Sequence, residues 1–361
     1  WTTTPWTLPG NVALAVGKDI EYVLLPNPHN EQETLIVSWR YALHNFVSRI
    51  TNDETNENGD FAKIVRADDS DQKEERNQIA EKHKIFFINQ DNFVGLKYTS
   101  LYETAGKDTE KSYKVVAGDF VTTDSGTGIV HIAPAFGEDD ANVGRESGLP
   151  TVLTVETDGT LSKGFGLPGE GIQVKKKNDK NRYAVDDLII EDMKGRGLFF
   201  KEEVYEHEYP FCWRCDTPLV YYAKPSWFIG MSELSEALVA NNEQVSWVPE
   251  HIKEGRFGEW LRGIKDWAIS RERYWGTPLP IWECGGCDAR TVVSSIAELS
   301  ELSGQTLEDV HKPYIDDVTW QCSCGGTMRR TPEVLDVWFD SGAMPLAQFA
   351  YPAKVDAAAK E

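Results

Sequence analysis

Residues 126–140 read GTGIVHIAPAFGEDD, and this stretch contains the clearest switch of local structure in the chain. A short β-branched run ends at His131, proline and glycine form a turn, and a helix then begins with three acidic residues, Glu138–Asp140. Acidic side chains in the first turn of a helix interact favourably with the helix dipole, so two of these three residues need no functional explanation. A histidine at a strand end is by itself more often structural than catalytic. Here, however, His131 and a carboxylate can converge across one strand–turn–helix corner, which is a usual place for a functional site.

The sequence on both sides of this corner mixes short strand signals with a few helical ones. Runs of β-branched and aromatic residues between Gly, Pro, Asn and Asp predict strands at residues 12–16, 22–25, 34–37, 85–88, 113–116, 129–132 and 151–155. Helical patterns cover residues 38–49, 71–83, 139–147 and 181–195. The mixture predicts an α+β, mainly β, domain over residues 1–202, with a strongly curved sheet or β-barrel and peripheral helices. The acidic stretch from about residue 53 to residue 78 is expected to be a mobile insertion with a helical end.

The character of the sequence changes at about residue 203, where Trp, Tyr and Cys become dense. We predict a second part over residues 203–361, made of short strands and loops with helices near residues 233–241 and 258–266. All six cysteines lie in close pairs, which in a chain without secretory features are typical of metal ligands rather than disulfides.

Two of these cysteine pairs have the spacing of a structural metal site. Cys284 and Cys287 enclose two glycines, and 34 residues separate them from Cys322 and Cys324, which two glycines follow. Thiolate pairs on such turns bind zinc tetrahedrally, so we predict a small zinc-ribbon-like module.

The third pair, Cys212 and Cys215, has no second pair to match it. It is either a free pair or half of a metal site that residues outside this chain complete.

The chain opens with WTTTPWTLPGN, residues 1–11. Its two prolines fix φ and remove backbone donors, so this stretch cannot be a regular central strand. Several hydroxyl groups are then held on a rigid loop, which is one way to line a small polar pocket. The alternative is a threonine-rich edge strand and turn.

Composition limits the classes of protein that this chain can belong to. Its 361 residues with 40% hydrophobic content suffice for two domains, and no apolar run approaches the ~20 residues of a membrane helix. The net charge of −21 argues against electrostatic binding of nucleic acid over the whole surface. Any contact with nucleic acid must be local, through a patch on the protein or with a short single-stranded end. The chain begins at Trp1 without a signal peptide, so we expect a cytoplasmic protein excised from a longer one.

Four stretches together resemble isoleucyl-tRNA synthetase in the expected order: WTTTPWTLPGN, GTGIVHIAPAFGEDD, WAISRERYWGTPLPIW at residues 267–282 and DVWFDSGAMP at residues 336–345. They are similar to the large editing insertion (connective peptide 1) of that class I enzyme and to its return into the catalytic domain. Leucyl and valyl relatives usually carry Thr-Thr-Arg-Pro where this chain has Thr2-Thr3-Thr4-Pro5, which favours the isoleucyl family. The His-x-Gly-His and Lys-Met-Ser-Lys-Ser signatures that hold ATP are absent from this sequence, so we do not expect it to make aminoacyl-adenylate by itself.

The resemblance implies post-transfer editing, in which the ester bond of misacylated valyl-tRNA(Ile) is hydrolysed. A single methylene separates isoleucine from valine and supports only ~1–3 kcal/mol of discrimination, a limit documented for these two amino acids themselves. By match to the family motif, Asp140 binds the α-ammonium of the misattached valine, with Asp139 as the weaker alternative. The resemblance also implies a catalytic set and a substrate-binding set, formed respectively by Asp140, His131 and Thr4 and by Thr2, Thr3, Thr7, Trp6, Asn11 and Gly137.

The resemblance further implies a monomer that contacts the 3′ end of tRNA(Ile), contains structural zinc and needs no cofactor for editing. Trp338 matches a residue that lines the isoleucine pocket of the synthetic site. Two other interpretations remain: the editing domain of a valyl or leucyl relative, and a zinc-containing tRNA-binding module without catalysis. The basic run Lys175-Lys176-Lys177 fits the last of these.

Overall fold

The computed structural model describes residues 1–52, 58–70, 72–176, 183–272 and 275–349. The chain divides into two units, Trp1–Ala223 and Lys224–Glu361. The boundary expected after residue 202 therefore falls inside the first unit. The reason is that the segment before Lys224 still packs there: the backbone N–H of Ala223 donates to the carbonyl of Ala135 at 2.7 Å, and Tyr222 packs against the core around Trp6.

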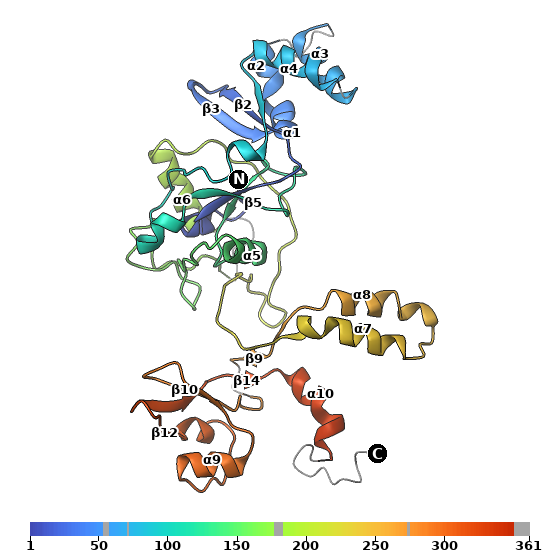
Figure 1. The fold of residues 1–361 in the computed structure, drawn as a ribbon. Helices are drawn as coiled ribbons and strands as arrows, with labels where there is room; N and C mark the ends of the chain where they lie inside the picture. The colour runs from blue at the N-terminus through green and yellow to red at the C-terminus, as the bar shows by residue number, and fades with distance from the viewer. Residues whose placement is uncertain (53–57, 71, 177–182, 273–274, 350–361) are drawn as a thin grey trace. The chain divides into compact units, whose positions relative to one another are not determined.

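The first unit is a mixture of short strands and helices (Figure 1). Its strands are β1 (Ala13–Val16), β2 (Tyr22–Asn27), β3 (Asn30–Ser38), β4 (Phe86–Ile88), β5 (Lys114–Ala117) and β6 (Ile129–Ile132). Its α-helices are α1 (Trp39–Ala42), α2 (Ser48–Thr51), α3 (Asp60–Asp69), α4 (Lys73–Lys82), α5 (Glu138–Glu146) and α6 (Ala184–Gly195). A π-helix, η2 (Leu43–Val47), joins α1 to α2, and 3₁₀ turns form η1 (Pro5–Gly10), η3 (Gln90–Asn92) and η4 (Gly106–Lys111).

Two small sheets form the centre of this unit. In the first sheet β1 lies between β5, to which it is parallel, and β6, to which it is antiparallel. In the second, β2 pairs antiparallel with both β3 and β4. The Tyr22 hydroxyl joins the two sheets, because it donates to the carbonyl of Gly128 at 2.7 Å and accepts from the N–H of Gly17 at 2.8 Å.

These elements confirm the prediction of a mixed α and β fold and most of its strands. The sheets are small, and none closes into a barrel among the residues that the structure describes. The strand expected at residues 151–155 is wrong: only a single bridge from Val155 to Leu161 forms there.

The insertion expected to be mobile is largely helical. Helices α3 and α4 lie side by side next to α2 (Figure 1) and bury apolar side chains, including Ile64 and Ile79, in a core with Phe46. Residues 53–57 and 71 lie outside the described residues. The helices form because two apolar faces are hidden within a mainly polar composition.

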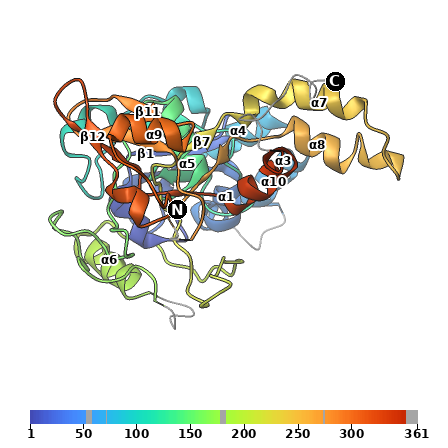
Figure 2. The same ribbon diagram turned by 90° about the horizontal axis from the view of Figure 1, so that it is seen from below.

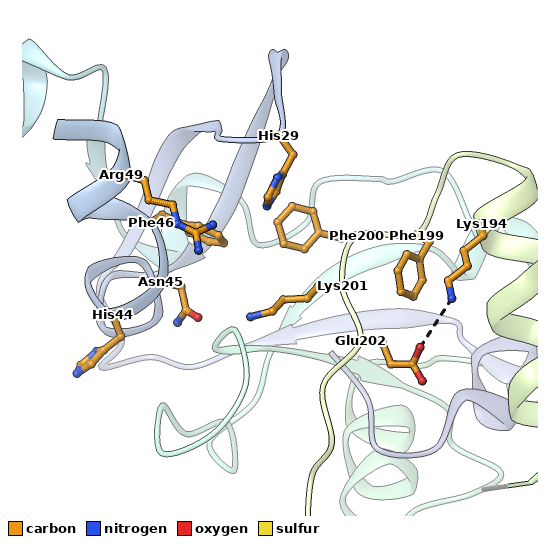
Figure 3. Close-up of a pocket in the computed structure, with 10 residues that line it drawn as sticks. All are labelled: His29, His44, Asn45, Phe46, Arg49, Lys194, Phe199, Phe200, Lys201 and Glu202. Atoms are coloured by element: carbon orange, nitrogen blue, oxygen red, sulfur yellow. Dashed lines mark ion pairs between the residues drawn. The ribbon is translucent and has the colours of Figure 1, made fainter. Parts of the chain in front are cut away.

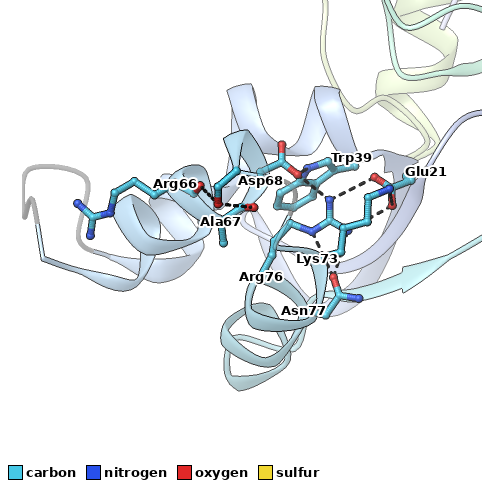
Figure 4. A network of polar contacts seen from close by, with 9 residues as sticks. Glu21, Trp39, Arg66, Ala67, Asp68, Lys73, Arg76 and Asn77 are labelled. Carbon is cyan, nitrogen blue, oxygen red and sulfur yellow. Dashed lines mark hydrogen bonds and ion pairs between the residues drawn. The ribbon is translucent and has the colours of Figure 1, made fainter.

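A buried arginine ties this helical pair to the second sheet (Figure 4). Arg76 on α4 is 1% exposed, and its guanidinium donates to Asp68 at 2.6 Å and to Glu21 at 3.2 Å. The guanidinium also lies 3.9 Å from the ring centroid of Phe87 on β4. A buried guanidinium needs such partners to offset its lost hydration, so the contacts fix the position of α4.

The second unit contains a sheet built from two hairpins. Its strands are β7 (Phe228–Ile229), β8 (Trp267–Ala268), β9 (Ser270–Arg271), β10 (Ile281–Cys284), β11 (Arg290–Val292), β12 (Trp320–Gln321), β13 (Thr327–Arg330) and β14 (Val334–Leu335). The order β11-β10-β13-β12 places one hairpin beside the other, and Trp282 is fully buried beneath them.

The helices of this unit are α7 (Ser235–Glu243), α8 (Arg256–Arg262), α9 (Ile296–Ser303) and α10 (Val337–Ala347), with 3₁₀ turns η5 (Met231–Leu234), η6 (Glu250–Ile252) and η7 (Tyr314–Asp317). Helices α7 and α8 lie side by side in both views (Figures 1 and 2). Both were predicted, although α8 ends at Arg262, before Gly263, rather than at residue 266. Within the part of the chain that the structure describes, none of the helices combines the length and the apolar character needed to span a bilayer.

Candidate functional site

The threonine-rich loop forms a chain of hydroxyl groups. Pro5 and Pro9 set the short 3₁₀ helix η1, which the sequence had predicted only as a rigid irregular loop. The Oγ1 atoms of Thr2 and Thr4 lie 3.4 Å apart, and those of Thr4 and Thr7 lie 3.2 Å apart. Thr7 Oγ1 donates to the carbonyl of Thr4 at 2.8 Å, which fixes the loop against itself.

His131, the third residue of β6, continues this chain of polar groups. Its Nε2 lies 3.1 Å from Thr7 Oγ1. The Thr7 hydroxyl donates its one proton to the carbonyl of Thr4, so toward His131 it can only accept a hydrogen bond. The ring proton of His131 is therefore on Nε2. Burial lowers the pKa of His131 to about 3. The imidazole is therefore neutral near pH 7, and its buried Nδ1 has no hydrogen-bond partner among the described residues.

Asp140 lies in the first turn of α5 and folds back toward the end of β6. Its Oδ1 accepts from the backbone N–H of Ala133 at 2.7 Å. Burial raises the pKa of this carboxyl group, and the hydrogen bond from Ala133 opposes that rise. Gly137 makes the position possible, because a Cβ on that residue would lie 2.2 Å from Asp140 Oδ2.

A cavity of about 220 Å³ collects most of the predicted site residues. It is lined by Thr2, Thr3, Thr4, Thr7, His131 and Asp140, together with Trp1, Val130, Ala133 and Phe136. Asp139, the alternative carboxylate, is exposed and does not line it. The sequence did not predict that the Trp1 ring lines the cavity. That ring packs against Tyr205, with the ring centroids 5.3 Å apart, and the two residues are far apart in the chain.

Three predicted binding residues support this cavity without lining it. The backbone N–H of Trp6 donates to Asp186 on α6 at 2.8 Å, and its ring packs on Phe136 at 5.2 Å. Asn11 is buried and bridges Ala13 and Tyr98 through its amide. Gly137 provides the space for Asp140 described above.

Four cysteines converge in the second unit. The Sγ atoms of Cys284, Cys287, Cys322 and Cys324 all lie within 4.8 Å of one another. Cys284 ends β10, and the turns hold glycines where a side chain would clash: a Cβ on Gly326 would lie 2.8 Å from Cys284 Sγ.

The spacing of these sulfur atoms fits a tetrahedral metal. Bonds of about 2.3 Å between zinc and sulfur separate the ligands of a tetrahedron by about 3.8 Å. The Cys284–Cys324 and Cys287–Cys322 sulfur distances are 3.5 and 3.9 Å. The chemistry and spacing of the donors are thus compatible with structural zinc.

The remaining predicted residues lie elsewhere. Cys212 and Cys215 lie in the first unit on a turn in which Asp216 donates to the Cys212 carbonyl, and the described residues bring no further cysteine, histidine or carboxylate into a three-ligand group with them. Of the basic run, Lys175 is buried with its ammonium 3.9 Å from the ring centroid of Tyr209, so it is no surface contact for nucleic acid. Lys176 is exposed, and Lys177 lies outside the described residues. Trp338 lies on α10 and is 73% exposed.

Comparisons with known proteins identify the family. Residues 31–361 match the family model described as tRNA synthetases class I (I, L, M and V). The chain is 43% identical over 355 residues to an isoleucine–tRNA ligase of Thermus thermophilus, covering 98% of this chain and 29% of that protein. It is 44% identical to isoleucine–tRNA ligase 2 of Pseudomonas fluorescens and 42% identical to an isoleucine–tRNA ligase of Clostridium tetani, each match covering 98% of this chain and 30% of the relative.

A solved complex of an Agrobacterium radiobacter LeuRS aligns with 99% of this chain and 31% of its own, with 16% identity and a TM-score of 0.21, which is too low to support a statement about the fold. The chain spans about three tenths of the length of the curated relatives it matches. From the extent of the family match, the chain belongs to the class I tRNA synthetases of the I, L, M and V group.

Proposed function

We propose that the cavity between the threonine-rich loop and α5 hydrolyses the ester bond of valyl-tRNA(Ile), as an editing site. The observation that carries this proposal is the position of Asp140, whose partly buried carboxylate faces a small cavity that is otherwise lined by threonine hydroxyls, aromatic rings and two small apolar residues. A carboxylate in such surroundings binds an ammonium group through a charge-assisted hydrogen bond. An esterified amino acid carries that ammonium next to the carbonyl that reacts.

The reaction adds one water molecule and breaks one bond. Water attacks the ester carbonyl, the bond from that carbon to the ribose oxygen breaks, and the ribose oxygen takes a proton. Valine and tRNA with a free 3′ end are the products. The threonine hydroxyls are suited to hold the terminal ribose and to orient water, since each can donate and accept.

His131 positions these groups rather than taking the proton. A group with a pKa of about 3 is a poor proton acceptor near neutral pH. Its Nε2–H instead holds Thr7, and through Thr7 the loop. The adjacent free hydroxyl of the terminal ribose is then the group we assign to the activation of water, in the substrate itself.

The four-cysteine site takes a structural part in this proposal. Four thiolates close the coordination shell of zinc and leave no position for water. The metal would hold the β10–β11 and β12–β13 hairpins together, and it would supply no hydroxide to the editing reaction.

A deacylation assay with the 361-residue chain tests the proposal. We expect release of valine from valyl-tRNA(Ile), slow release of isoleucine from isoleucyl-tRNA(Ile), and no amino-acid-dependent ATP–pyrophosphate exchange. Thr4→Ala and Thr7→Ala should enlarge the pocket and permit partial hydrolysis of isoleucyl-tRNA, because a methyl-sized filter is worth only ~1–3 kcal/mol.

The alternative, a zinc-containing tRNA-binding module, predicts binding without release of either amino acid. A chain that binds tRNA(Ile) and leaves valyl-tRNA intact would favour it and overturn the editing proposal. Hydrolysis of threonyl-tRNA(Val) in preference to valyl-tRNA(Ile) would instead indicate a valyl-type site.

A further inference from the structure

A second cavity of the first unit carries a charge opposite to that of the chain as a whole. It has a volume of about 540 Å³ and lies between the α1–α2 region and the segment that follows α6 (Figure 3). Arg49, Lys194 and Lys201 contribute cations to its lining, whereas Glu202 is the acidic residue in that lining. In a chain of net charge −21 such a local cluster provides an attractive potential for an anion.

Among the described residues, two of the three cations of this cavity have an acidic partner. Lys194 pairs with Glu202 at 3.8 Å, and Lys201 pairs with Glu203. Arg49 is exposed and has no acidic partner among the described residues. The pKa of Lys201 is raised, chiefly by its contact with Glu203, and the charge of Arg49 acts in the opposite direction. Arg49 and Lys201 both line the cavity, so a phosphate inside it is attracted by both cations.

An exposed aromatic ring lies within the same cavity. Phe200 is 43% exposed, and contacts to His29 at 5.9 Å and to Phe46 at 6.0 Å hold its ring in place. Figure 3 shows the rings of His29 and Phe200 side by side, with the amino group of Lys201 extended toward Asn45. Cations combined with an open aromatic face are the means by which proteins bind single-stranded nucleic acid without reading its sequence.

The chain also connects this cavity to the candidate editing pocket. Beyond Phe200 the backbone runs without helix or strand to Tyr205, whose ring packs against Trp1 at 5.3 Å, and Trp1 lines the editing pocket. An extended segment from Phe200 to Tyr205 spans at most about 18 Å. A single strand of RNA that enters one site is therefore within reach of the other.

We propose that the cavity around Arg49 and Phe200 binds a nucleotide of single-stranded RNA, with a phosphate at Arg49 and Lys201 and a base against Phe200. This inference deepens the proposed function, because it gives the tRNA end a contact outside the hydrolytic pocket. The site has no part in the chemistry, so RNA binding and hydrolysis are separate measurements.

The test is fluorescence anisotropy of the 361-residue chain with a labelled single-stranded oligoribonucleotide, repeated over a range of salt concentrations. Arg49→Gln should weaken binding and reduce the slope of log K against log salt by about 0.7, the value for one phosphate contact to a single strand. Phe200→Ala should weaken binding about five- to a hundredfold and leave that slope unchanged, because stacking is uncharged.

Matched controls keep these outcomes specific. Arg329→Gln removes an exposed arginine of the second unit, and Phe86→Ala removes a ring of β4 that is 47% exposed. Both should bind as the parent does. Parental affinity in Arg49→Gln and Phe200→Ala overturns the proposal, and so does displacement of the RNA by oligoglutamate at equal charge concentration, which would indicate a peptide site.

The result also separates this inference from the editing proposal. Asp140→Asn should slow hydrolysis roughly ten- to a hundredfold and retain RNA binding, whereas Arg49→Gln should reduce RNA binding and raise the KM for valyl-tRNA without changing kcat. Hydrolysis that is unaffected in both KM and kcat by Arg49→Gln contradicts the RNA site and leaves the editing site standing. Normal RNA binding with no hydrolysis by the parent chain contradicts only the editing site.

Discussion

Asp140 Oδ1 accepts a hydrogen bond from the backbone N–H of Ala133 at 2.7 Å, and this bond joins the first turn of α5 to the residue that follows β6. The carboxylate thus has a structural role in addition to the ammonium binding that we propose for it. An asparagine keeps an oxygen acceptor for Ala133 and removes the negative charge. The substitution Asp140→Asn therefore separates the two roles better than an alanine does.

We expect Asp140→Asn to hydrolyse valyl-tRNA(Ile) roughly ten- to a hundredfold more slowly than the parent. The loss corresponds to the ~1.5–3 kcal/mol of a hydrogen bond to a charged group. Asp139→Asn is the matched control, because Asp139 is the exposed neighbour outside the pocket. Single-turnover deacylation rates measure the effect of both substitutions. If Asp139→Asn hydrolyses slowly and Asp140→Asn hydrolyses at the parental rate, Asp139 is the residue that binds the ammonium.

The same variant should change the dependence of stability on pH. Burial raises the pKa of Asp140 above its ordinary value of 3.8, so the native state binds this proton more tightly than the unfolded state does. The stability that this group contributes is complete below pH 3.8 and is lost as the pH rises through the native pKa. Asp140→Asn has no such loss.

Urea unfolding of parent and variant at several pH values checks this sign. The free energy of unfolding of Asp140→Asn, relative to the parent, should increase from acid to neutral pH. A relative stability that falls over this interval would mean that the native carboxylate is stabilised, for example by a cation that we have not identified.

Gly137→Ala should impair editing through Asp140 without unfolding the unit. An added Cβ would lie 2.2 Å from Asp140 Oδ2, so the carboxylate must move. The backbone itself tolerates the change, since the φ of Gly137 is −154°. We expect a rate loss similar to that of Asp140→Asn, with near-parental circular dichroism. Gly195→Ala at the end of α6, where nothing lies within 4 Å, should hydrolyse normally.

The candidate site was predictable to the extent that its signals are local. The strand, turn and acidic helix start lie in one stretch, so His131 and Asp140 could be placed at one corner from sequence. The proline pattern likewise indicated a rigid loop for the threonines. Trp1 could not be assigned to the pocket wall, because its position depends on Tyr205, which lies in a distant part of the chain.

Other features depend on packing that composition conceals. Helix α3 mixes polar and apolar residues and fully buries Ile64, whereas α4 buries the charged Arg76. Both residues looked like parts of a solvated insertion. The cavity around Arg49 and Phe200 is lined by residues from distant segments of the chain, so no local sequence motif predicts it.

Arg76→Ala should destabilise the helical pair α3–α4. It leaves Asp68 without its 2.6 Å partner and removes the cation from the face of Phe87. Loss of one member of a buried pair costs about 3–5 kcal/mol, and the partial exposure of Asp68 and Glu21 reduces this to roughly 2–4 kcal/mol. Hydrogen exchange in α3 and α4 measures the effect. Arg40→Ala, which breaks the exposed pair with Asp124, should change exchange little.

The last prediction concerns the metal. The purified chain should contain one zinc per molecule, held by Cys284, Cys287, Cys322 and Cys324, whose sulfur atoms lie within 4.8 Å of one another. Cys284→Ser should lose the zinc, whereas Cys212→Ser should retain it, because no third and fourth ligand join Cys212 and Cys215 among the described residues. Such sites contribute an apparent ~10–16 kcal/mol in small peptides, so chelation should expose the β10–β13 hairpins to exchange first. The editing cavity contains no cysteine in its lining and should keep its hydrolytic rate after chelation.

Elemental analysis gives the number of zinc ions, and hydrogen exchange locates the segments that chelation exposes. Two tightly bound zinc ions would show that Cys212 and Cys215 have found further ligands. Unchanged protection of the hairpins in a zinc-free chain would show that packing around the buried Trp282 suffices to hold them.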